Sequence, residues 1–204
     1  MKPIAIYGAG GLGREVLTII EAINEQKPTW KFIGFFDDGV VGHNILGGLD
    51  ALNEFQGSLY LVIALGSTAL KENLVQKIAN DNIQYATLIH PRATILSKAV
   101  VIGEGTIIGA GAVLTVDIEV GKHVLINLNA TVGHDCKLGD YCSVMPGVNI
   151  AGAVVVGAKV LVGSGANILN GLHIGENVKI GSGAVVTKDI IDNNTVIGIP
   201  ARPL

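Results

Sequence analysis

Hydrophobic residues follow two different patterns along this chain of 204 residues. In the first part, short apolar runs alternate with segments whose apolar residues recur at helical spacing. The runs cover residues 4–7, 32–36 and 60–65, and helical spacing extends from the glycine turn at 8–13 to residue 24 and again over about 68–80. Strands that alternate with helices predict parallel βαβ units.

From Leu96 onward the pattern changes to a period of six. All sixteen positions from 96 to 186 in steps of six are Ile, Leu or Val, and nine of the sixteen following residues are glycine. The fourth residue after each aliphatic is always Ala, Val, Thr, Cys, Leu or Ile. Such a repeat predicts a parallel β-helix in which each short strand points an aliphatic side chain inward. We expect glycine to turn the corners, where positive φ is required, and no loop to interrupt the register.

The repeats resemble those of the left-handed β-helix acyltransferases, in which three hexads form one triangular coil. Sixteen hexads then correspond to a little over five coils. At roughly 4.8 Å for each coil, the rod should be about 25 Å tall. The expected architecture is an α/β Rossmann-like domain over residues 1–90, followed by an all-β left-handed parallel β-helix over residues 91–204.

Cys136 and Cys142 both fall on the small inward position of consecutive hexads. We interpret them as core residues on different walls of one coil, because an apolar site raises the pKa of a thiol and hides it. A catalytic or redox role is the alternative. Two cysteines without CxxC spacing are too few for a disulfide framework, so reduced thiols are expected.

Composition and charge exclude several classes of partner. The formal net charge of -3 and the pI near 5.9 provide no cationic surface for nucleic acid or anionic lipid. The mean hydropathy is positive, but apolar runs stop after eight or nine residues. A membrane span needs about eighteen or more, so we expect no membrane insertion. The start of the chain lacks the features of a signal peptide, which favours a cytoplasmic location.

The densest cluster of polar residues covers positions 127–141. His134 lies two places after the inward Val132 and should point outward at a corner. An imidazole titrates near neutrality, which suits a general base that takes a proton from an amine or hydroxyl attacking a thioester. The neighbouring Asp135 can orient the ring. From spacing alone, an ordinary surface histidine is the alternative.

Residues 127–140, with the core Val-Gly-His-Asp-Cys-Lys-Leu-Gly-Asp, resemble the active-site stretch of the bacterial sugar acyltransferases. These include UDP-4-amino-sugar N-acetyltransferases and sialic acid O-acetyltransferases. The resemblance covers the whole chain, since the family's other motifs occur in order: the glycine turn 8–13, Asp37-Asp38, Gly66, Ile89-His90-Pro91 and the ending 198–202.

By this resemblance His134 is the base, and Asp135 occupies a carboxylate position where some members carry Glu. Gly152 lies one full coil beyond His134, where the family pattern implies a backbone N–H aimed at the thioester oxygen. Acetyl-CoA in this family lies along a groove between neighbouring rods, which implies a homotrimer. The positions that match its contacts here are Ser143, Ser164 and Ser182.

The glycine turn at 8–13 has competing interpretations. A turn between a strand and a helix presents backbone N–H groups to a phosphate. We prefer a nucleotide-sugar site, with the diphosphate or sugar near the turn, the uridine on a pair of acids, and a later glycine allowing close approach. An NAD site is disfavoured because about 88 residues leave no room for a second mononucleotide half. A tight turn with solvated acids is the remaining alternative. The assigned residues are Gly10, Gly11, Leu12, Asp37, Asp38 and Gly66.

A metal site is not expected, although other left-handed β-helices bind zinc through three histidines from adjacent rods. The last three of the five histidines lie in the repeat, and no two of them share a place in the hexad. The histidines are His43, His90, His123, His134 and His173.

The predicted function is acetyl-CoA-dependent N-acetylation of a UDP-linked 4-amino sugar in bacterial glycan synthesis. O-acetylation of a sialic acid or related sugar would use the same base on a hydroxyl. A nucleotide-binding regulator or scaffold, without thioester chemistry, is the alternative from a different class.

Overall fold

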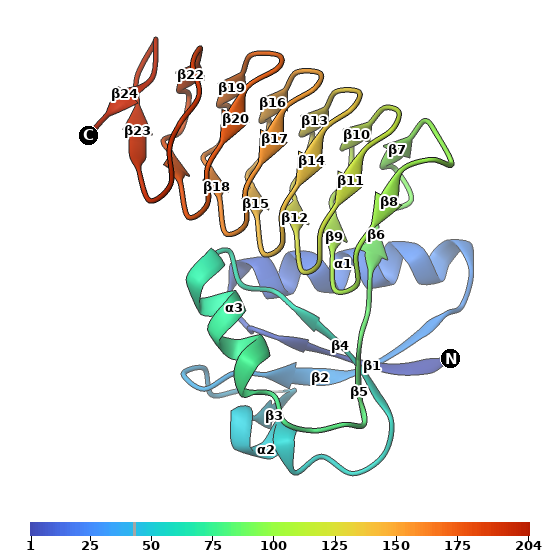
Figure 1. Ribbon diagram of the computed structural model, residues 1–204. Helices are drawn as coiled ribbons and strands as arrows, with labels where there is room; N and C mark the ends of the chain where they lie inside the picture. The colour runs from blue at the N-terminus through green and yellow to red at the C-terminus, as the bar shows by residue number, and fades with distance from the viewer. Residues whose placement is uncertain (43) are drawn as a thin grey trace.

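The computed structural model describes residues 1–42 and 44–204, which form an α/β domain packed beneath a rod of stacked coils (Figure 1). The N-terminal domain holds a five-stranded parallel sheet in the order β3-β2-β1-β4-β5. Its elements are β1 (Lys2–Tyr7), α1 (Gly11–Gln26), β2 (Trp30–Phe36), β3 (Ile45–Gly47), α2 (Leu49–Asn53), β4 (Leu59–Ile63), α3 (Thr68–Lys77) and β5 (Ile83–Tyr85).

The central strand β1 shows why helices cover both faces of this sheet. Ile4 and Ile6 pack with α1, whereas Ala5 and Tyr7 pack with α2 and α3. Successive side chains of a strand point to opposite faces, so a continuous apolar run requires cover on both. The alternating strand and helix pattern is confirmed. The short elements β3, α2 and β5 carry too few residues to show a period and were not predicted.

The rod is a parallel β-helix with three walls of stacked two-residue strands. Wall 1 comprises β6 (Leu88–Ile89), β9 (Ile107–Ile108), β12 (Leu125–Ile126), β15 (Ser143–Val144), β18 (Leu161–Val162), β21 (Lys179–Ile180) and β23 (Thr195–Ile197), with β24 (Arg202–Pro203) antiparallel to β23. Wall 2 comprises β7 (Thr94–Ile95), β10 (Val113–Leu114), β13 (Thr131–Val132), β16 (Asn149–Ile150), β19 (Asn167–Ile168) and β22 (Val185–Val186). Wall 3 comprises β8 (Val101–Ile102), β11 (Glu119–Val120), β14 (Lys137–Leu138), β17 (Val155–Val156) and β20 (His173–Ile174).

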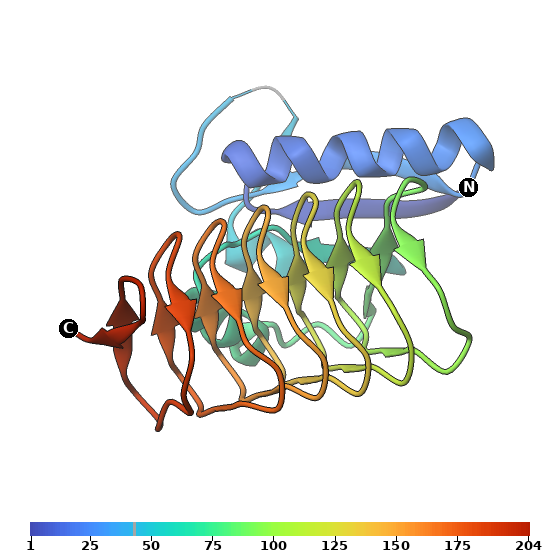
Figure 2. The same ribbon diagram turned by 90° about the horizontal axis from the view of Figure 1, so that it is seen from above.

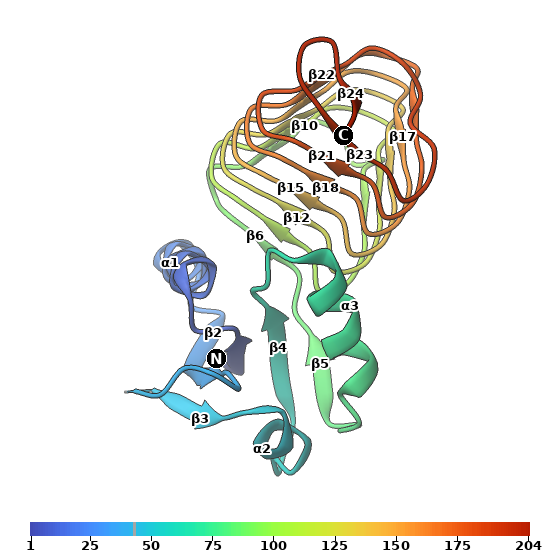
Figure 3. The same ribbon diagram turned by 90° about the vertical axis from the view of Figure 1, so that its left-hand side faces the viewer.

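The chain visits the walls in the order 1, 2, 3. Seen from the C-terminal end in Figure 3, it runs clockwise while it advances toward the viewer, which is a left-handed coil. We name the three edges of the rod by the walls they join: corner 1–2, corner 2–3 and corner 3–1. The predicted fold class is confirmed, and the first β-helix strand, β6, begins just before the expected domain boundary at residue 90.

The period of six holds from Ile102 to Val186, but the first and last repeats depart from it. Leu96 was expected inside and is 62% exposed, because β7 places Ile95, not Leu96, opposite Leu114. The segment between Ile95 and Ile102 is therefore one residue longer than a hexad. Wall 1 extends from β6 to β23, so the rod is longer than the five coils expected from the repeat.

The glycine after each inward aliphatic was expected to turn a corner with positive φ, and this expectation was wrong. Positive φ falls two residues later, for example at Asp135 (58°) and Gly165 (68°). The earlier glycine is needed for close approach instead. A Cβ on Gly133 would lie 2.6 Å from the backbone nitrogen of Gly152 in the next coil. Coils stacked at strand spacing leave no room for a side chain there.

The N-terminal domain covers wall 1 and leaves the outer faces of walls 2 and 3 open (Figures 1 and 2). Val16 and Ile19 of α1 share one buried cluster with Ile107 and Leu125, which are the outward residues of β9 and β12. On the other side of wall 1, α3 packs beside corner 3–1. This apolar contact fixes which edges of the rod remain free for function.

Candidate functional site

His134 and Asp135 form a hydrogen-bonded pair at corner 2–3. The Nδ1 atom of His134 lies 2.7 Å from Oδ2 of Asp135. The His134 side chain is 62% exposed, so the pair is open to solvent in a single chain. When Nδ1–H donates to the carboxylate, Nε2 keeps its lone pair and can accept a proton. This arrangement matches the geometry expected of a general base with an orienting carboxylate.

The left-handed backbone at Asp135 explains how two consecutive side chains meet. Its φ is 58°, and Asp135 is the third residue of its corner. The third residue of every corner has a positive φ, from residue 105 to residue 183 in steps of six. Aspartate tolerates this conformation better than most residues. The turn therefore places both side chains on the outside of one corner.

Gly152 leaves the space that the His134 ring fills. A Cβ at Gly152 would overlap Nε2 of His134, and its next contacts would be ring carbons at 2.6 and 2.8 Å. The proton-accepting nitrogen thus sits against the backbone of the next coil. The resemblance assigned Gly152 for its backbone N–H, and the structure adds that a side chain at this position would meet the His134 ring.

The backbone N–H of Gly152 is available to a ligand oxygen. The second residue of corner 3–1 shows what an N–H group in this position of a corner can bind: the N–H of Lys122 donates to Asp140 (2.7 Å) and that of Glu176 to Asp192 (2.8 Å). Among residues 1–42 and 44–204, no group accepts from the N–H of Gly152. This position therefore suits an oxyanion.

The glycine turn forms an open, uncapped helix N-terminus. Gly10 is the N-cap of α1, no side chain caps it, and the first turn holds no acidic residue. Nothing lies within 4 Å of the Cβ positions of Gly10 and Gly11, whereas Gly8 and Gly13 are packed against backbone. Free N–H groups at the start of a 16-residue helix favour a phosphate.

The carboxylate oxygens of Asp37 and Asp38 accept hydrogen bonds from other groups of the protein. Asp37 accepts from the N–H of Ala9 at 2.8 Å and from the N–H groups of Gly39 and Val40 at 2.9 Å. Burial alone would raise the pKa of Asp37, but these three donors hold it below its ordinary value. Asp37 thereby ties the glycine turn to the loop after β2.

Asp38 is held from two sides. Its Oδ1 accepts from the N–H of Leu49 at 2.8 Å, and its Oδ2 accepts from the hydroxyl of Tyr7 at 2.5 Å. Burial and this hydrogen bond raise the pKa of Tyr7. Both acids line a cavity of about 250 Å³ between the sheet and α3. Gly66 lies at the domain seam instead, where its Cβ would touch Met145 at 3.4 Å.

The three serines expected at the thioester do not share one environment. Ser164 and Ser182 are exposed at corner 1–2, in the same position of successive coils, and Gly183 N–H donates to the Ser164 carbonyl at 2.9 Å. Ser143 has no exposed surface and lies under α3, where its Oγ is 3.2 Å from Nζ of Lys71. A side chain buried this way cannot touch a ligand, so Ser143 belongs to the domain seam.

Lys71 lies at the contact between the N-terminal domain and the rod, and the sequence did not single it out. It is 2% exposed, and its Nζ also donates to the carbonyl of Cys142 at 3.2 Å. Burial lowers the pKa of Lys71 to about 8, opposed by the nearby Cys142 thiol. Helical spacing in α3 shows a lysine on a buried position, but only the neighbouring coil reveals what it binds.

The cysteines lie inside the rod as expected. Both have no exposed surface, and they lie in consecutive corners of one coil. Burial raises the pKa of Cys136, and that of Cys142 to about 12. Neither thiol contributes to the corner 2–3 site.

The histidines are separated in space. His123 is buried between Tyr85 and Tyr141, and burial and Lys71 lower its pKa to about 4. His90 lies beside α1, and His173 faces outward on wall 3. His43 lies outside the described residues. In the described part of the chain, no three His, Cys, Asp or Glu side chains are placed to hold a metal ion.

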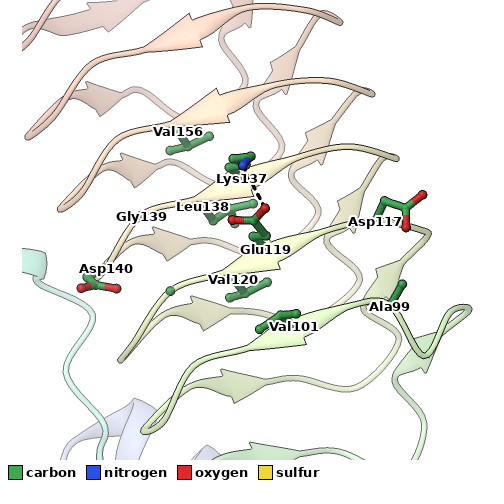
Figure 4. Close-up of a pocket in the computed structure, with 11 residues that line it drawn as sticks. Ala99, Val101, Asp117, Glu119, Val120, Lys137, Leu138, Gly139, Asp140 and Val156 are labelled. Carbon is green, nitrogen blue, oxygen red and sulfur yellow. Dashed lines mark ion pairs between the residues drawn. The ribbon is translucent and has the colours of Figure 1, made fainter.

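A wide cleft of about 680 Å³ lies on the outer face of wall 3, next to corner 2–3 (Figure 4). Glu119 and Lys137 form an ion pair of 2.8 Å across it, and Asp117 lies one coil before Asp135. None of the predicted site residues lines this cleft.

The two halves of the predicted site lie on opposite sides of one chain. The N-terminal domain packs on wall 1, whereas corner 2–3 is the edge farthest from it (Figures 1 and 3). His134 therefore cannot act on a group held at the glycine turn of its own chain.

Across residues 1–42 and 44–204, no helix has the length and apolarity to cross a bilayer.

Comparison with known proteins agrees with this architecture. Residues 3–78 match the family described as the PglD N-terminal domain, and residues 153–188 match the bacterial transferase hexapeptide (six repeats) family. UDP-N-acetylbacillosamine N-acetyltransferase from Bacillus subtilis is 33% identical over 114 residues, which is 54% of this chain and 52% of that protein. The chain thus matches about half the length of this curated relative.

Solved structures of similar proteins match the entire chain, as two of them show. PerB from Caulobacter crescentus, in complex with CoA and GDP-perosamine, is 31% identical with a TM-score of 0.89, and the match covers 100% of this chain and 98% of that one. The acetyltransferase domain of PglB from Neisseria gonorrhoeae is 30% identical with a TM-score of 0.88, and the match covers both chains fully. The latter domain has also been solved in complex with acetyl coenzyme A.

Proposed function

Because the chain belongs to the sugar acetyltransferases with hexapeptide repeats, we propose that it transfers the acetyl group of acetyl-CoA to the amine of a nucleotide-linked amino sugar. A UDP-linked 4-amino sugar is the proposed acceptor. The observation that carries this proposal is the His134–Asp135 pair, with Nε2 free against the backbone of Gly152. The Bacillus subtilis relative, which acts on a UDP-linked sugar, supports the nucleotide.

In the proposed reaction the neutral sugar amine attacks the thioester carbonyl. A C–N bond forms while Nε2 of His134 takes a proton from the nitrogen. Asp135 stabilises the resulting imidazolium through the 2.7 Å hydrogen bond. The Gly152 N–H donates to the oxyanion of the tetrahedral intermediate. Collapse breaks the C–S bond, and the proton on His134 passes to the departing thiolate to give CoA.

The glycine turn is the proposed diphosphate site. No side chain among the described residues caps the start of α1, and Gly10 and Gly11 leave open space for phosphate oxygens, with Leu12 beside them. Asp37 and Asp38 line the adjoining cavity, where they would face the uridine. Their internal hydrogen bonds shape this cavity. Gly66 lies outside it at the contact with the rod, where the absence of a side chain allows close approach to Met145.

Acetyl-CoA is proposed to lie along the rod. Ser164 and Ser182 are exposed in the same corner position of successive coils, which suits an extended ligand parallel to the axis. Ser143 is left out of these contacts because it is buried under α3.

The remote position of corner 2–3 supports a homotrimer. One chain offers its glycine turn on the wall 1 side, and another must supply His134. A closed ring of identical chains provides every site with both halves.

The test measures acetyl-CoA consumption and the acetylated product by mass spectrometry, with UDP- and GDP-linked 4-amino sugars, free sialic acid and CMP-linked sialic acid as acceptors. We expect N-acetylation of the UDP-linked sugar. His134→Ala should lower kcat by about 10²- to 10⁴-fold. Asp135→Asn, which keeps the shape of the side chain, should cost less. A folded His134→Ala protein with full turnover would contradict the mechanism, and no turnover with any acceptor would favour a scaffold.

A further inference from the structure

The cavity of about 250 Å³ beside α3 lies at the carboxyl end of the parallel sheet. Among the residues that line it, Tyr7 ends β1, Asp37 follows β2 and Leu65 follows β4. The chain leaves β1 toward β2 and later returns on the other side of β1 at β4, and α1 and α3 lie on opposite faces of the sheet (Figure 3). In open parallel sheets, ligands bind in the crevice where the strand order reverses in this way. The topology therefore marks this cavity as a binding site independently of the glycine turn.

The two acids of this cavity are poorly suited to recognise a base. Asp37 accepts from three backbone N–H groups, and Asp38 accepts from the N–H of Leu49 and from the hydroxyl of Tyr7. These bonds fix both carboxylates in the cavity wall. An ionised carboxylate is also an acceptor only, so it cannot pair with the carbonyl oxygens of a base. Donors for those oxygens must come from another part of the cavity.

One face of α3 supplies the opposite wall. Leu70, Asn73, Leu74 and Lys77 all line the cavity, and their spacing places them on one side of the helix. Asn73 and Lys77 are exposed, and among residues 1–42 and 44–204 neither side chain has a hydrogen-bond or ion-pair partner. Leu70 is 62% exposed, so it offers a large apolar surface that a bound ring would cover. This face combines apolar contacts with uncommitted donors.

The two polar groups of α3 match the edge of a pyrimidine base. Uracil presents one N–H between two carbonyl oxygens, O4 and O2. The amide of Asn73 both accepts and donates, so it can pair with the N–H and with O4, whereas the ammonium of Lys77 only donates and suits O2. Guanine carries an amino group where uracil carries O2. A donor that faces another donor leaves both without a partner, which costs affinity.

We propose that Asn73 and Lys77 recognise the edge of the nucleobase of the acceptor, and that Lys77 selects a pyrimidine over guanine. The inference rests on the proposed function in that the cavity is taken to hold the nucleotide of a sugar acceptor. Asp37 accepts from the N–H of Ala9 at 2.8 Å and so joins the cavity wall to the glycine turn. A diphosphate at the start of α1 would therefore place its base in this cavity. The Asn73 amide can rotate to fit cytosine, so the choice falls between pyrimidines and guanine.

Calorimetric titration with UDP, CDP and GDP tests the proposal on the wild-type protein. We expect UDP and CDP to bind with similar Kd and GDP to bind at least about tenfold more weakly. Lys77→Met should weaken UDP and CDP about tenfold and leave GDP nearly unchanged, because only O2 loses its donor. Asn73→Ala should weaken all three ligands, since its amide pairs with the part of the edge that these bases share.

A charge reversal and a matched control sharpen this test. Lys77→Glu should reverse the order of UDP and GDP, because a carboxylate accepts from the amino group of guanine. Lys31→Met removes an exposed lysine on β2 of the same domain, outside the cavity, and should bind all three ligands like the wild type. Circular dichroism and the thermal midpoint check that each variant is folded.

Three results would overturn the inference: a wild type that binds none of the ligands, one that does not prefer UDP to GDP, or a folded Lys77→Met protein with an unchanged ratio of the two Kd values. Binding requires no acetyl transfer, so the two proposals fail separately. A protein that selects UDP through Lys77 but forms no acetylated product would contradict the proposed function alone. Acetylation of a UDP-linked sugar, with the same base preference in wild type and Lys77→Met, would contradict this inference alone.

Discussion

Lys71 shows how one buried charge joins the two domains. Its amino group lies between α3 and the corner 3–1 coil, bound to the Cys142 carbonyl and the Ser143 hydroxyl. The adjacent Glu72 forms an ion pair of 3.4 Å with Lys159 of the rod. Burying an ammonium group disfavours its charged form, which is why the pKa of Lys71 falls to about 8 from an ordinary value of 10.5.

This lowered pKa makes stability depend on pH in a definite direction. Between pH 8 and 10.5 the unfolded chain keeps the proton that folded Lys71 has lost, so the free energy of unfolding rises with pH in this window. Lys71→Met removes this contribution. We expect the wild type to gain stability relative to the variant by at most about 1.4 kcal/mol for each pH unit.

Urea unfolding of both proteins from pH 7 to 11 checks this expectation, because other titrating groups cancel in the difference. Lys77→Met, at the end of the same helix, is the control and should run parallel to the wild type. A constant difference between wild type and Lys71→Met across the window would show that Lys71 titrates normally.

At the scale of the element, glycines in the corners of the rod serve different purposes. Gly139 is packed against backbone, since its Cβ would lie 2.6 Å from the nitrogen of Ala158. Gly152 instead makes room for the side chain of His134. Backbone cannot yield, whereas an exposed imidazole can rotate away.

The two substitutions should therefore have opposite effects. Gly152→Ala should displace the His134 ring and lower kcat by roughly 10²-fold, because small misplacements of a catalytic group are costly. Its thermal midpoint should change little. Gly139→Ala should lower the thermal midpoint while the folded fraction keeps a normal kcat. Equal activity losses with equal destabilisation would refute this distinction between catalytic and packing glycines.

At the scale of the whole molecule, the proposed function assigns His134 and the glycine turn of one chain to different sites. His134→Ala removes the proposed base. Gly11→Glu places a carboxylate at the start of α1, where it would compete with the proposed diphosphate but suits a helix N-terminus. Each variant alone should be inactive. Unfolding and refolding the two variants together should restore a substantial fraction of wild-type turnover, because mixed assemblies contain sites with both parts intact.

Each variant refolded alone is the control for this complementation. No recovery in a preparation shown by its composition to contain mixed assemblies would contradict a site shared between chains.

Much of this protein was determined locally by the sequence. The aliphatic repeat of six residues determines the coil, the side chains that point inward and the corner at which His134 is exposed. All of these depend on neighbours only a few residues away. The same holds for the βαβ pattern and for Cys136 and Cys142, which lie inside the rod as their place in the hexad required. Motif order likewise sufficed for the family.

The tertiary structure decided what depends on contacts between distant residues. Helices α1 and α3 contact residues of wall 1 that lie far along the chain, and these contacts determine which wall the N-terminal domain covers. Ser143 is buried beneath Lys71 as a result. The exposure of Leu96 follows from strand pairing with β10, which the period of six does not report. The period repeats identically on all three walls, so only the packing of one domain on the other distinguishes the covered wall 1 from the open walls 2 and 3.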